Sequence, residues 1–325
     1  MLKVGKISLE APFFQAALSG YSDYAMRKLA VSFGAPLTFA PLMLAKSVAV
    51  PKVLAKPFFR PHNHEHPVGA QILGNDPNEM AQAAKALEGV GYDLIDLNFA
   101  CPAGKVLRRR RGGYLLKEPA VVLEIYQRVR DAVGCPVLVK LRAGFDQSRQ
   151  MQDNFWQIVT ELAVQGADGV IIHPRTVIQR FKGSADWDIL AKVKCRFDRM
   201  TIIGSGDLFD VDAVRLLMTG SGVDGVAIAR GAIGNPWIFA QLRAFFDGKA
   251  CPAVPDVCRQ HGVILGHFKH VTELYGQVRA VGHFRKFIVG YCRLHPQRKK
   301  AQRDLLAAAD SCQLFAALDK WYPLS

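Results

Sequence analysis

Two glycine-rich turns, Gly204-Ser205-Gly206-Asp207 and Ala229-Arg230-Gly231-Ala232-Ile233-Gly234, decide between the folds that this chain could adopt. Each turn follows a short apolar run, and these two runs are the seventh and eighth of a series. In eight-stranded barrels, backbone N–H groups at the ends of the last two strands cradle a phosphate. A doubly wound dinucleotide fold instead carries its glycine-rich turn after the first strand. Here the first run ends in Ser19-Gly20-Tyr21 without such a motif, which favours the barrel.

Apolar runs and amphipathic stretches alternate from the start of the chain to residue 246. Runs that are apolar along their whole length are typical of parallel strands covered by helices. The expected strands are 12–18, 37–42, 68–73, 93–98, 136–141, 168–173, 200–204 and 224–229. The expected helices are 22–33, 77–90, 119–133, 154–165, 185–194, 211–218 and 236–246. The fold class is therefore α/β, with an eight-stranded parallel (β/α)8 TIM barrel over residues 1–246.

The pattern changes after residue 246. Residues 248–255 contain Gly, Ala and two Pro and are typical of a linker, and no strand pattern follows them. Residues 251–325 hold 11 Lys or Arg against five Asp or Glu, with basic residues recurring from Arg279 to Arg303. We expect residues 247–325 to form a smaller, all-helical domain that binds RNA. A solvated helical bundle packed on the barrel is the alternative.

Composition and charge narrow the class of protein. The chain has 325 residues, half of them hydrophobic, and a formal net charge of +14 at pH 7. Such a charge favours contact with nucleic acid or an anionic membrane, but no apolar run is long enough to span a bilayer. The seven cysteines form no C-x-x-C pair, which argues against a zinc site or a disulfide framework. We expect a cytoplasmic, monomeric protein with no membrane and no metal.

The loop after the fourth expected strand combines a thiol with a run of arginines. It reads Asn98-Phe-Ala-Cys101-Pro-Ala-Gly-Lys105-Val, followed by Arg108, Arg109, Arg110 and Arg111. A strand end fixes such a thiol while the loop exposes it, so Cys101 is a candidate acid or nucleophile. The arginines supply a field that suits a polyanion. Together these features predict chemistry on a nucleic acid; a buried core cysteine and a solvated arginine face are the alternative.

The other strand ends predict an anionic cofactor. They carry two cations, a histidine, a glutamine and the two glycine turns, and no nucleophile–base–acid triad. FMN fits this set best, with its phosphate at the two turns and Lys140 near the ring, where it would stabilise the charge of the reduced flavin. The expected cofactor site is Ala17, Leu18, Ser19, Gln71, Lys140, His173, Ser205, Gly206, Asp207, Ala229 and Arg230. The expected substrate contacts are Asn98, Arg142, Arg175, Arg108, Arg109, Arg110 and Arg111.

These motifs resemble those of the tRNA-dihydrouridine synthase family. The likeness lies in the cysteine loop, in the turns already quoted, and in Val139-Lys140-Leu-Arg142-Ala-Gly144 and Ile172-His173-Pro-Arg175-Thr176. The resemblance implies an FMN barrel that reduces uridine in tRNA to 5,6-dihydrouridine, with NADPH as electron donor. It also implies that Cys101 is the general acid and that Lys140, His173 and Gln71 hold the flavin. The chemistry agrees, because saturating the uracil C5–C6 bond needs a hydride and a proton, and a protonated thiol can donate the latter.

Two positions depart from the family pattern, and two other functions compete with this one. The first strand ends Ala16-Ala17-Leu18 where the family has A-P-M, and Ser205 replaces an asparagine. Both positions concern flavin binding rather than the fold. One competing function is that of a flavin barrel acting on a free pyrimidine, like dihydroorotate dehydrogenase, for which the basic surfaces would be unnecessary. The other is an RNA-binding paralogue without catalysis, which the altered first strand supports.

Overall fold

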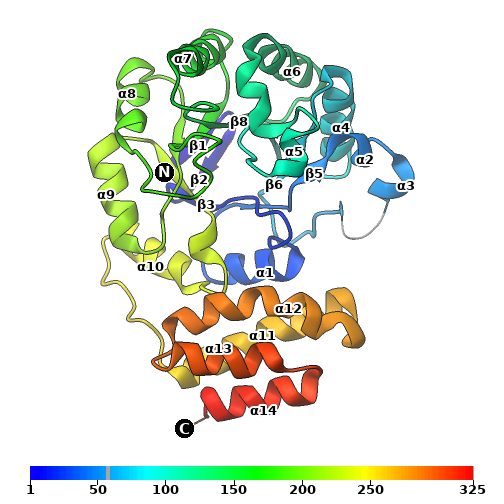
Figure 1. Ribbon diagram of the computed structural model, residues 1–325, viewed down its shortest axis with the longest axis vertical. Helices are drawn as coiled ribbons and strands as arrows, with labels where there is room; N and C mark the ends of the chain where they lie inside the picture. The colour runs from blue at the N-terminus through cyan, green and yellow to red at the C-terminus, as the bar shows by residue number, and fades with distance from the viewer. Residues whose placement is uncertain (56–58, 325) are drawn as a thin grey trace.

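Eight parallel strands close into a barrel in the computed structural model, which describes residues 1–55 and 59–324 (Figure 1). Each barrel strand pairs in parallel with its neighbours, and pairings of β11 with β3 and of β4 with β6 complete the ring. A further short strand, β5 (Met43–Leu44), also pairs with β6. The predicted barrel is therefore confirmed. Its strands are β3 (Phe13–Gln15), β4 (Thr38–Phe39), β6 (Val68–Leu73), β7 (Leu94–Asn98), β8 (Val137–Arg142), β9 (Gly169–His173), β10 (Ile202–Gly204) and β11 (Gly225–Ile228).

Helices surround the strands, as Figure 1 shows. The longer ones are α1 (Tyr24–Ser32), α4 (Pro77–Gly89), α6 (Pro119–Ala132), α7 (Arg149–Val164), α8 (Asp188–Arg196), α9 (Val211–Ser221) and α10 (Trp237–Phe246). The short ones are α2 (Ala45–Val48), α3 (Pro51–Leu54) and α5 (Gly104–Leu107). The start predicted for α7, residue 154, was wrong. Ser148 caps this helix by accepting a hydrogen bond from the Met151 N–H, so it begins five residues earlier.

The barrel interior is apolar at one end and polar at the other. Strand side chains alternate in direction, so residues two apart along a strand both point inward. The inward apolar residues form one buried cluster: Phe14, Phe39, Leu94, Leu138, Ile171 and Ile203. An N-terminal hairpin of β1 (Leu2–Val4) and β2 (Ile7–Leu9) adds Leu2, Val4 and Leu9 to this cluster. Two residues further along their strands, the inward positions carry Asp96, Lys140 and His173, so polar groups gather at the carboxyl end.

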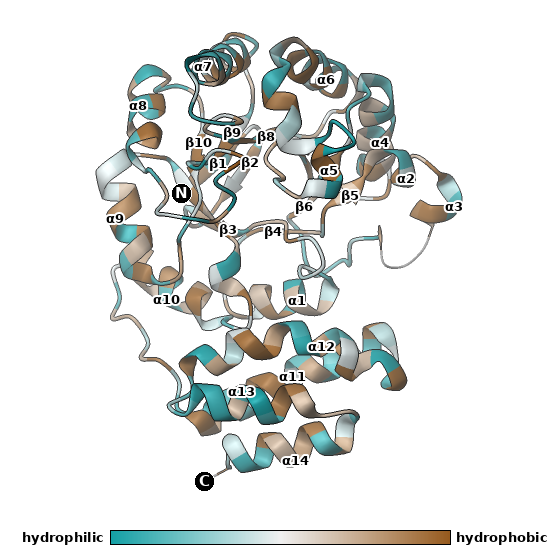
Figure 2. Ribbon diagram, viewed as in Figure 1, coloured by the Kyte–Doolittle hydropathy of each residue, from teal (hydrophilic) through white to brown (hydrophobic). Residues whose placement is uncertain are grey.

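Four helices form the C-terminal region, which lies beside α1 and α10 in Figure 1. They are α11 (Val257–Tyr275), α12 (Gln277–Tyr291), α13 (Arg298–Ala307) and α14 (Ser311–Trp321), and the described residues after Phe246 contain no strand. Figure 2 shows hydrophilic residues along α13, where exposed Arg298, Lys299 and Lys300 follow one another. None of the helices in the described residues is both long and apolar enough to cross a membrane.

Direct contacts tie the helical region to the barrel. Asp23, the N-cap of α1, is buried and accepts hydrogen bonds from Lys286 Nζ at 2.8 Å and from Tyr275 Oη at 3.0 Å. Two glycines allow the backbones to touch as well. A Cβ on Gly290 of α12 would lie 1.8 Å from the Ile233 carbonyl oxygen, at the end of the second glycine turn. Gly234, with φ +61°, packs against the same helix from the other side of this contact.

We predict that Gly290→Ala lowers the free energy of unfolding by about 3 kcal/mol or more, because its Cβ would overlap backbone atoms that cannot move aside. Gly282 is the matched control, since it lies in the same helix with no atom within 4 Å of its ideal Cβ. Gly282→Ala should raise stability by about 0.5–1 kcal/mol through helix propensity. Urea denaturation of both variants checks this, and equal stabilities would contradict the close contact.

Candidate active site

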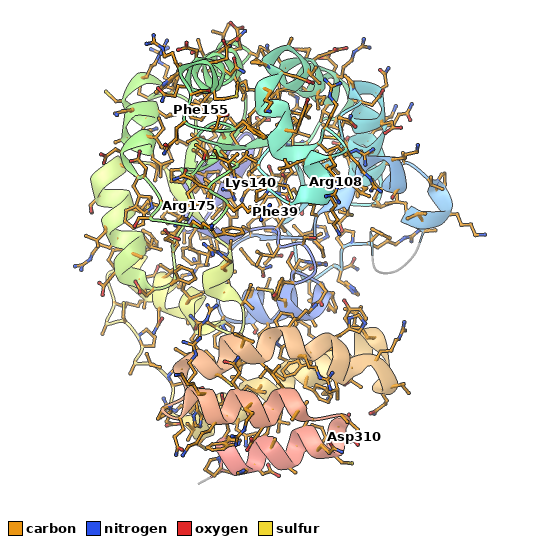
Figure 3. The ribbon with its side chains drawn as sticks, in the orientation of Figure 1. Phe39, Arg108, Lys140, Phe155, Arg175 and Asp310 are labelled. Carbon is orange, nitrogen blue, oxygen red and sulfur yellow. The ribbon has the colours of Figure 1, made fainter. Side chains whose placement is uncertain are left out.

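One pocket at the carboxyl end of the barrel collects most of the residues predicted for the site. Thirteen of them line it: Ala17, Leu18, Ser19, Asn98, Cys101, Lys140, Arg142, His173, Ser205, Gly206, Asp207, Ala229 and Arg230. Gln71, Arg175 and the four arginines 108–111 are not among its lining residues. In Figure 3, Lys140 lies inside the ring of helices, whereas Arg108 lies near α5.

Two aromatic residues at this pocket were not predicted from the sequence. Phe181, 52% exposed, comes from the loop after β9, and Phe209, 39% exposed, from the loop after β10. The guanidinium of Arg230 lies 4.2 Å from the Phe181 ring centroid and 5.4 Å from that of Phe209. Phe181 stands between Arg180 and Lys182, and this basic–aromatic–basic triplet is the signal that would have indicated it.

Cys101 is held by the backbone of its own loop. Asn98 Oδ1 accepts hydrogen bonds from the N–H groups of Ala100 and Cys101, both at 3.0 Å. The Gly113 N–H donates to the Cys101 carbonyl at 3.1 Å. Gly112, with φ +59°, passes so close that a Cβ on it would lie 3.0 Å from Cys101 Cβ. The glycine pair therefore packs on the cysteine, whose half-buried thiol lines the pocket.

A chain of side-chain amides lies beneath this loop. Asn98 Nδ2 donates to Gln71 Oε1 at 2.7 Å, and Gln71 Nε2 donates to Asp96 Oδ2 at 2.6 Å. The register explains the contact, because Gln71 on β6 stands directly opposite Asp96 on β7. The role predicted for Gln71, binding the flavin, stays a prediction. Asp96 was not predicted as a site residue.

Lys140 is the cation at the base of the pocket. Its ammonium group forms no hydrogen bond or ion pair with any residue in the described part of the chain, so its charge is available to a ligand. Burial lowers the pKa of Lys140, an effect that Asp96 opposes and Arg142 reinforces. Burial in turn raises the pKa of Asp96 to about 6, against the attraction of Lys140 and the hydrogen bond from Gln71. The opposite charges of Lys140 and Asp96 thus favour each other's ionised form, against the effect of burial.

His173 is neutral in this environment. Burial, followed by the positive charges of Arg142, Lys140, Arg175 and Arg230, lowers its pKa to about 2. Arg175 Nη1, which can only donate, lies 3.5 Å from His173 Nε2, so the neutral imidazole accepts at Nε2 and carries its proton on Nδ1.

Arg142 and Arg175 are engaged mainly with the protein itself. Arg142 donates to the carbonyl of Ala100 at 2.8 Å and to those of Thr176 and Arg180 at 3.0 and 2.8 Å. It thus joins the cysteine loop to the loop after β9. Arg175, 2% exposed, binds both carboxylate oxygens of Asp207. The predicted contacts of these arginines with substrate stay predictions, and the structure gives both a second role in fixing loops.

The first glycine turn has the geometry of an anion site. Gly206 (φ +104°) and Asp207 (φ +59°) are consecutive left-handed residues. Their N–H groups donate to no described residue, and such adjacent free donors bind anions. The second turn packs directly on it, since a Cβ on Gly231 would lie 2.1 Å from the Leu208 carbonyl oxygen. The Ser205 hydroxyl, in contrast, already donates to the Ile172 carbonyl at 3.2 Å.

Known proteins match this chain over most of its length. The family described as "Dihydrouridine synthase (Dus)" matches residues 14–320. The chain belongs to the dihydrouridine synthase family. A probable tRNA-dihydrouridine synthase from Rickettsia conorii is 30% identical over 292 residues, which cover 90% of this chain and 87% of the relative. A tRNA-dihydrouridine synthase B from Pasteurella multocida is 28% identical over 323 residues, covering 99% and 96%. The resemblance inferred from the motifs is thus confirmed.

Solved structures of other enzymes share the barrel of this dihydrouridine synthase family member. Histamine dehydrogenase from Rhizobium sp. 4-9 matches with a TM-score of 0.61 and 14% identity, over 83% of this chain. The match spans half the length of that protein. Morphinone reductase in complex with tetrahydroNAD matches with a TM-score of 0.51 and 13% identity, over 78% of this chain and 91% of the other. At these identities the matches show the fold alone.

The arginine run of this family member divides into two pairs. Arg108 and Arg109 are exposed and have no side-chain partner within the described residues. Arg110 pairs with Glu118, and Arg111 donates to Asn75 Oδ1 at 3.1 Å. Only the first pair is therefore free to contact a polyanion without breaking an existing interaction.

We predict that His173 makes stability depend on pH below about 6.5. The unfolded chain takes up a proton there, whereas the folded chain leaves His173 neutral down to about pH 2, so stability is lost as the pH falls. His173→Gln removes this difference. Between pH 6.5 and 5, wild type should lose about 1 kcal/mol per pH unit more than the variant. Urea denaturation at several pH values measures both slopes, and identical slopes would show that His173 is protonated in the folded state.

Proposed function

We propose that this protein reduces uridine in tRNA to 5,6-dihydrouridine, with FMN as cofactor and NADPH as electron donor. The observation that carries the proposal is the single pocket that holds a thiol, an unpaired lysine and a pair of free N–H groups. Membership of the dihydrouridine synthase family supports the same reaction and weighs against a free pyrimidine as substrate. We also propose that the protein acts in the cytoplasm as a monomer.

The residues of the pocket fit FMN. The N–H groups of Gly206 and Asp207, with the guanidinium of Arg230, would hold the phosphate, and the pairing of Asp207 with Arg175 keeps that turn rigid. Lys140 and neutral His173 would contact the ring. Of the two departures from the family pattern, Ala17 keeps an N–H that proline lacks, and Ser205 binds strand β9. Neither removes the features on which this fit depends.

The chain's own part in the reaction is to place the uracil and to supply a proton. A bound flavin would supply the hydride for uracil C6. Cys101 Sγ–H would donate its proton to C5, and the thiolate that remains would then take up a proton from water. Asn98 holds the backbone of Ala100 and Cys101, and Arg142 holds the Ala100 carbonyl, so the thiol stays in place. The target base must leave its stack to enter the pocket.

The basic surfaces suit a long polyanion rather than a free nucleotide. Arg108 and Arg109 are exposed beside the cysteine loop, and Arg298, Lys299 and Lys300 are exposed on α13. We propose that residues 247–325 are a tRNA-binding domain whose orientation is fixed by the contact of Asp23 with Lys286 and by the glycine contact at α12.

We predict that Cys101→Ala lowers the rate of dihydrouridine formation by about 10²–10⁴-fold, because the general acid is lost and the hydride source is not. FMN content and NADPH-dependent flavin reduction should remain within about twofold of wild type, since neither needs the proton donor. Mass analysis of a tRNA transcript measures the product. Cys195→Ala is the control, because Cys195 is exposed on α8 and does not line the pocket. Near-normal activity in Cys101→Ala would assign the proton to another donor.

We predict that replacing Arg108 and Arg109 together by Ala weakens tRNA binding and makes it less sensitive to salt. Each lost phosphate contact should lower the slope of log K against log salt by about 0.7–0.9. Binding titrations from low to high salt check this. Arg199→Ala is the control, as Arg199 is exposed just before β10, at the other end of the barrel strands. An unchanged slope in the double variant would place the RNA elsewhere.

A further inference from the structure

Asp96 is a buried carboxylate for which the chemistry above provides no role. It points into the barrel from β7 and is 1% exposed. Its Oδ2 accepts the hydrogen bond from Gln71, and its Oδ1 has no hydrogen-bond partner among the described residues. Burying a carboxylate with one oxygen unpaired costs stability, and such groups concentrate at functional sites.

The hydrogen bonds around Asp96 leave one orientation for each amide. The N–H groups of Ala100 and Cys101 can only donate, so the atom of Asn98 that faces them is Oδ1. Asn98 Nδ2 then faces Gln71, which must present Oε1. Gln71 Nε2 therefore needs an acceptor, and Asp96 Oδ2 is that acceptor. The orientations deduced from the two ends of this Asp96–Gln71–Asn98 chain agree.

The charge of Asp96 makes the arrangement unique. An ionised carboxylate can only accept, whereas a neutral side chain with a donor would allow both amides to flip. Lys140, on the neighbouring strand β8, is the charged group that favours the ionised form of Asp96. A flip of Gln71 and Asn98 would turn the Asn98 amide donor toward the N–H groups of the cysteine loop and lose both hydrogen bonds that hold it.

We propose that Asp96 is a positioning residue, which acts through Gln71 and Asn98 to hold the backbone of Cys101 where its thiol can reach the substrate. The proposal rests on the proposed function, because it concerns the proton that Cys101 donates. It differs from a purely structural role, since its effect must pass through Cys101 and must depend on the acceptor at position 96.

Two substitutions separate the acceptor from the volume of the side chain. Asp96→Asn keeps an oxygen that can accept from Gln71 but adds an amide donor, which allows Gln71 and Asn98 to flip. Asp96→Leu removes every acceptor. We expect the single-turnover rate of dihydrouridine formation to fall by about tenfold in Asp96→Asn and by about 100-fold in Asp96→Leu, as expected when a reacting group is misplaced. Affinity for tRNA should stay within about threefold of wild type, because Asp96 does not contact the surface that binds it. Val139→Ala, at an outward-facing position on β8, controls for the loss of core stability.

A double-mutant cycle with Cys101→Ala gives the decisive measurement. If Asp96 acts through the thiol, Asp96→Leu should cost less than about threefold in the Cys101→Ala background, against 100-fold in wild type. Equal losses in both backgrounds, or a loss explained by FMN content, would overturn the proposal. If Asp96→Leu does not fold, the test uses Asp96→Asn instead. A wild-type rate of dihydrouridine formation in Asp96→Asn would also overturn the proposal. A wild-type protein that forms no dihydrouridine in tRNA would instead contradict the proposed function.

Discussion

The closed ring of parallel strands constrains every other part of this structure. Closing the ring through β4 and β6 leaves the eight barrel strands without a free edge, and alternate side chains of these strands point into one narrow interior. The amino-terminal part of the barrel interior is filled by apolar side chains, among them Phe14, Phe39, Leu94 and Leu138. The N-terminal hairpin packs on the same cluster. Polar side chains are then accommodated only at the carboxyl ends, where loops and solvent can satisfy them. The position of the pocket follows from this packing rather than from any one loop.

The charges at the pocket form a second level of organisation. Lys140, Arg142, Arg175 and Arg230 bring four cations together, and the nearby carboxylates are Asp96 and Asp207. The carboxylate of Asp207 forms ion pairs with Arg175 and Arg230 near the glycine turns. The charge of Asp96 interacts with that of Lys140. Burial and the excess of positive charge keep His173 neutral, and the positive charge favours an anionic ligand. The same groups therefore organise the loops and set the electrostatic character of the pocket.

Much of this arrangement could be predicted from the sequence. The continuous apolar runs and the glycine turns after the seventh and eighth strands predicted the barrel, which the structure confirms. The cysteine, lysine and histidine motifs predicted the family, which the comparisons confirm. Thirteen predicted site residues line one pocket because each lies at or just after the carboxyl end of a barrel strand. Phe181 and Phe209 escaped prediction because they lie in irregular loops, whose path depends on tertiary contacts. The start of α7 was missed because its first turns are polar and only the Ser148 cap marks it.

By itself, the sequence determined the class of fold, the family and the residue types at each strand end, because these depend on local pattern and on motif spacing. The tertiary structure decided which of these residues meet and what each is free to do. In the folded chain Arg175 binds Asp207, and Lys140 has no hydrogen-bond partner among the described residues. Asp96 is linked to the cysteine loop through the amides of Gln71 and Asn98. Gly290 packs directly against the backbone of Ile233. These contacts join segments far apart in the chain. Their distances depend on barrel closure and strand register, which no local stretch of sequence encodes.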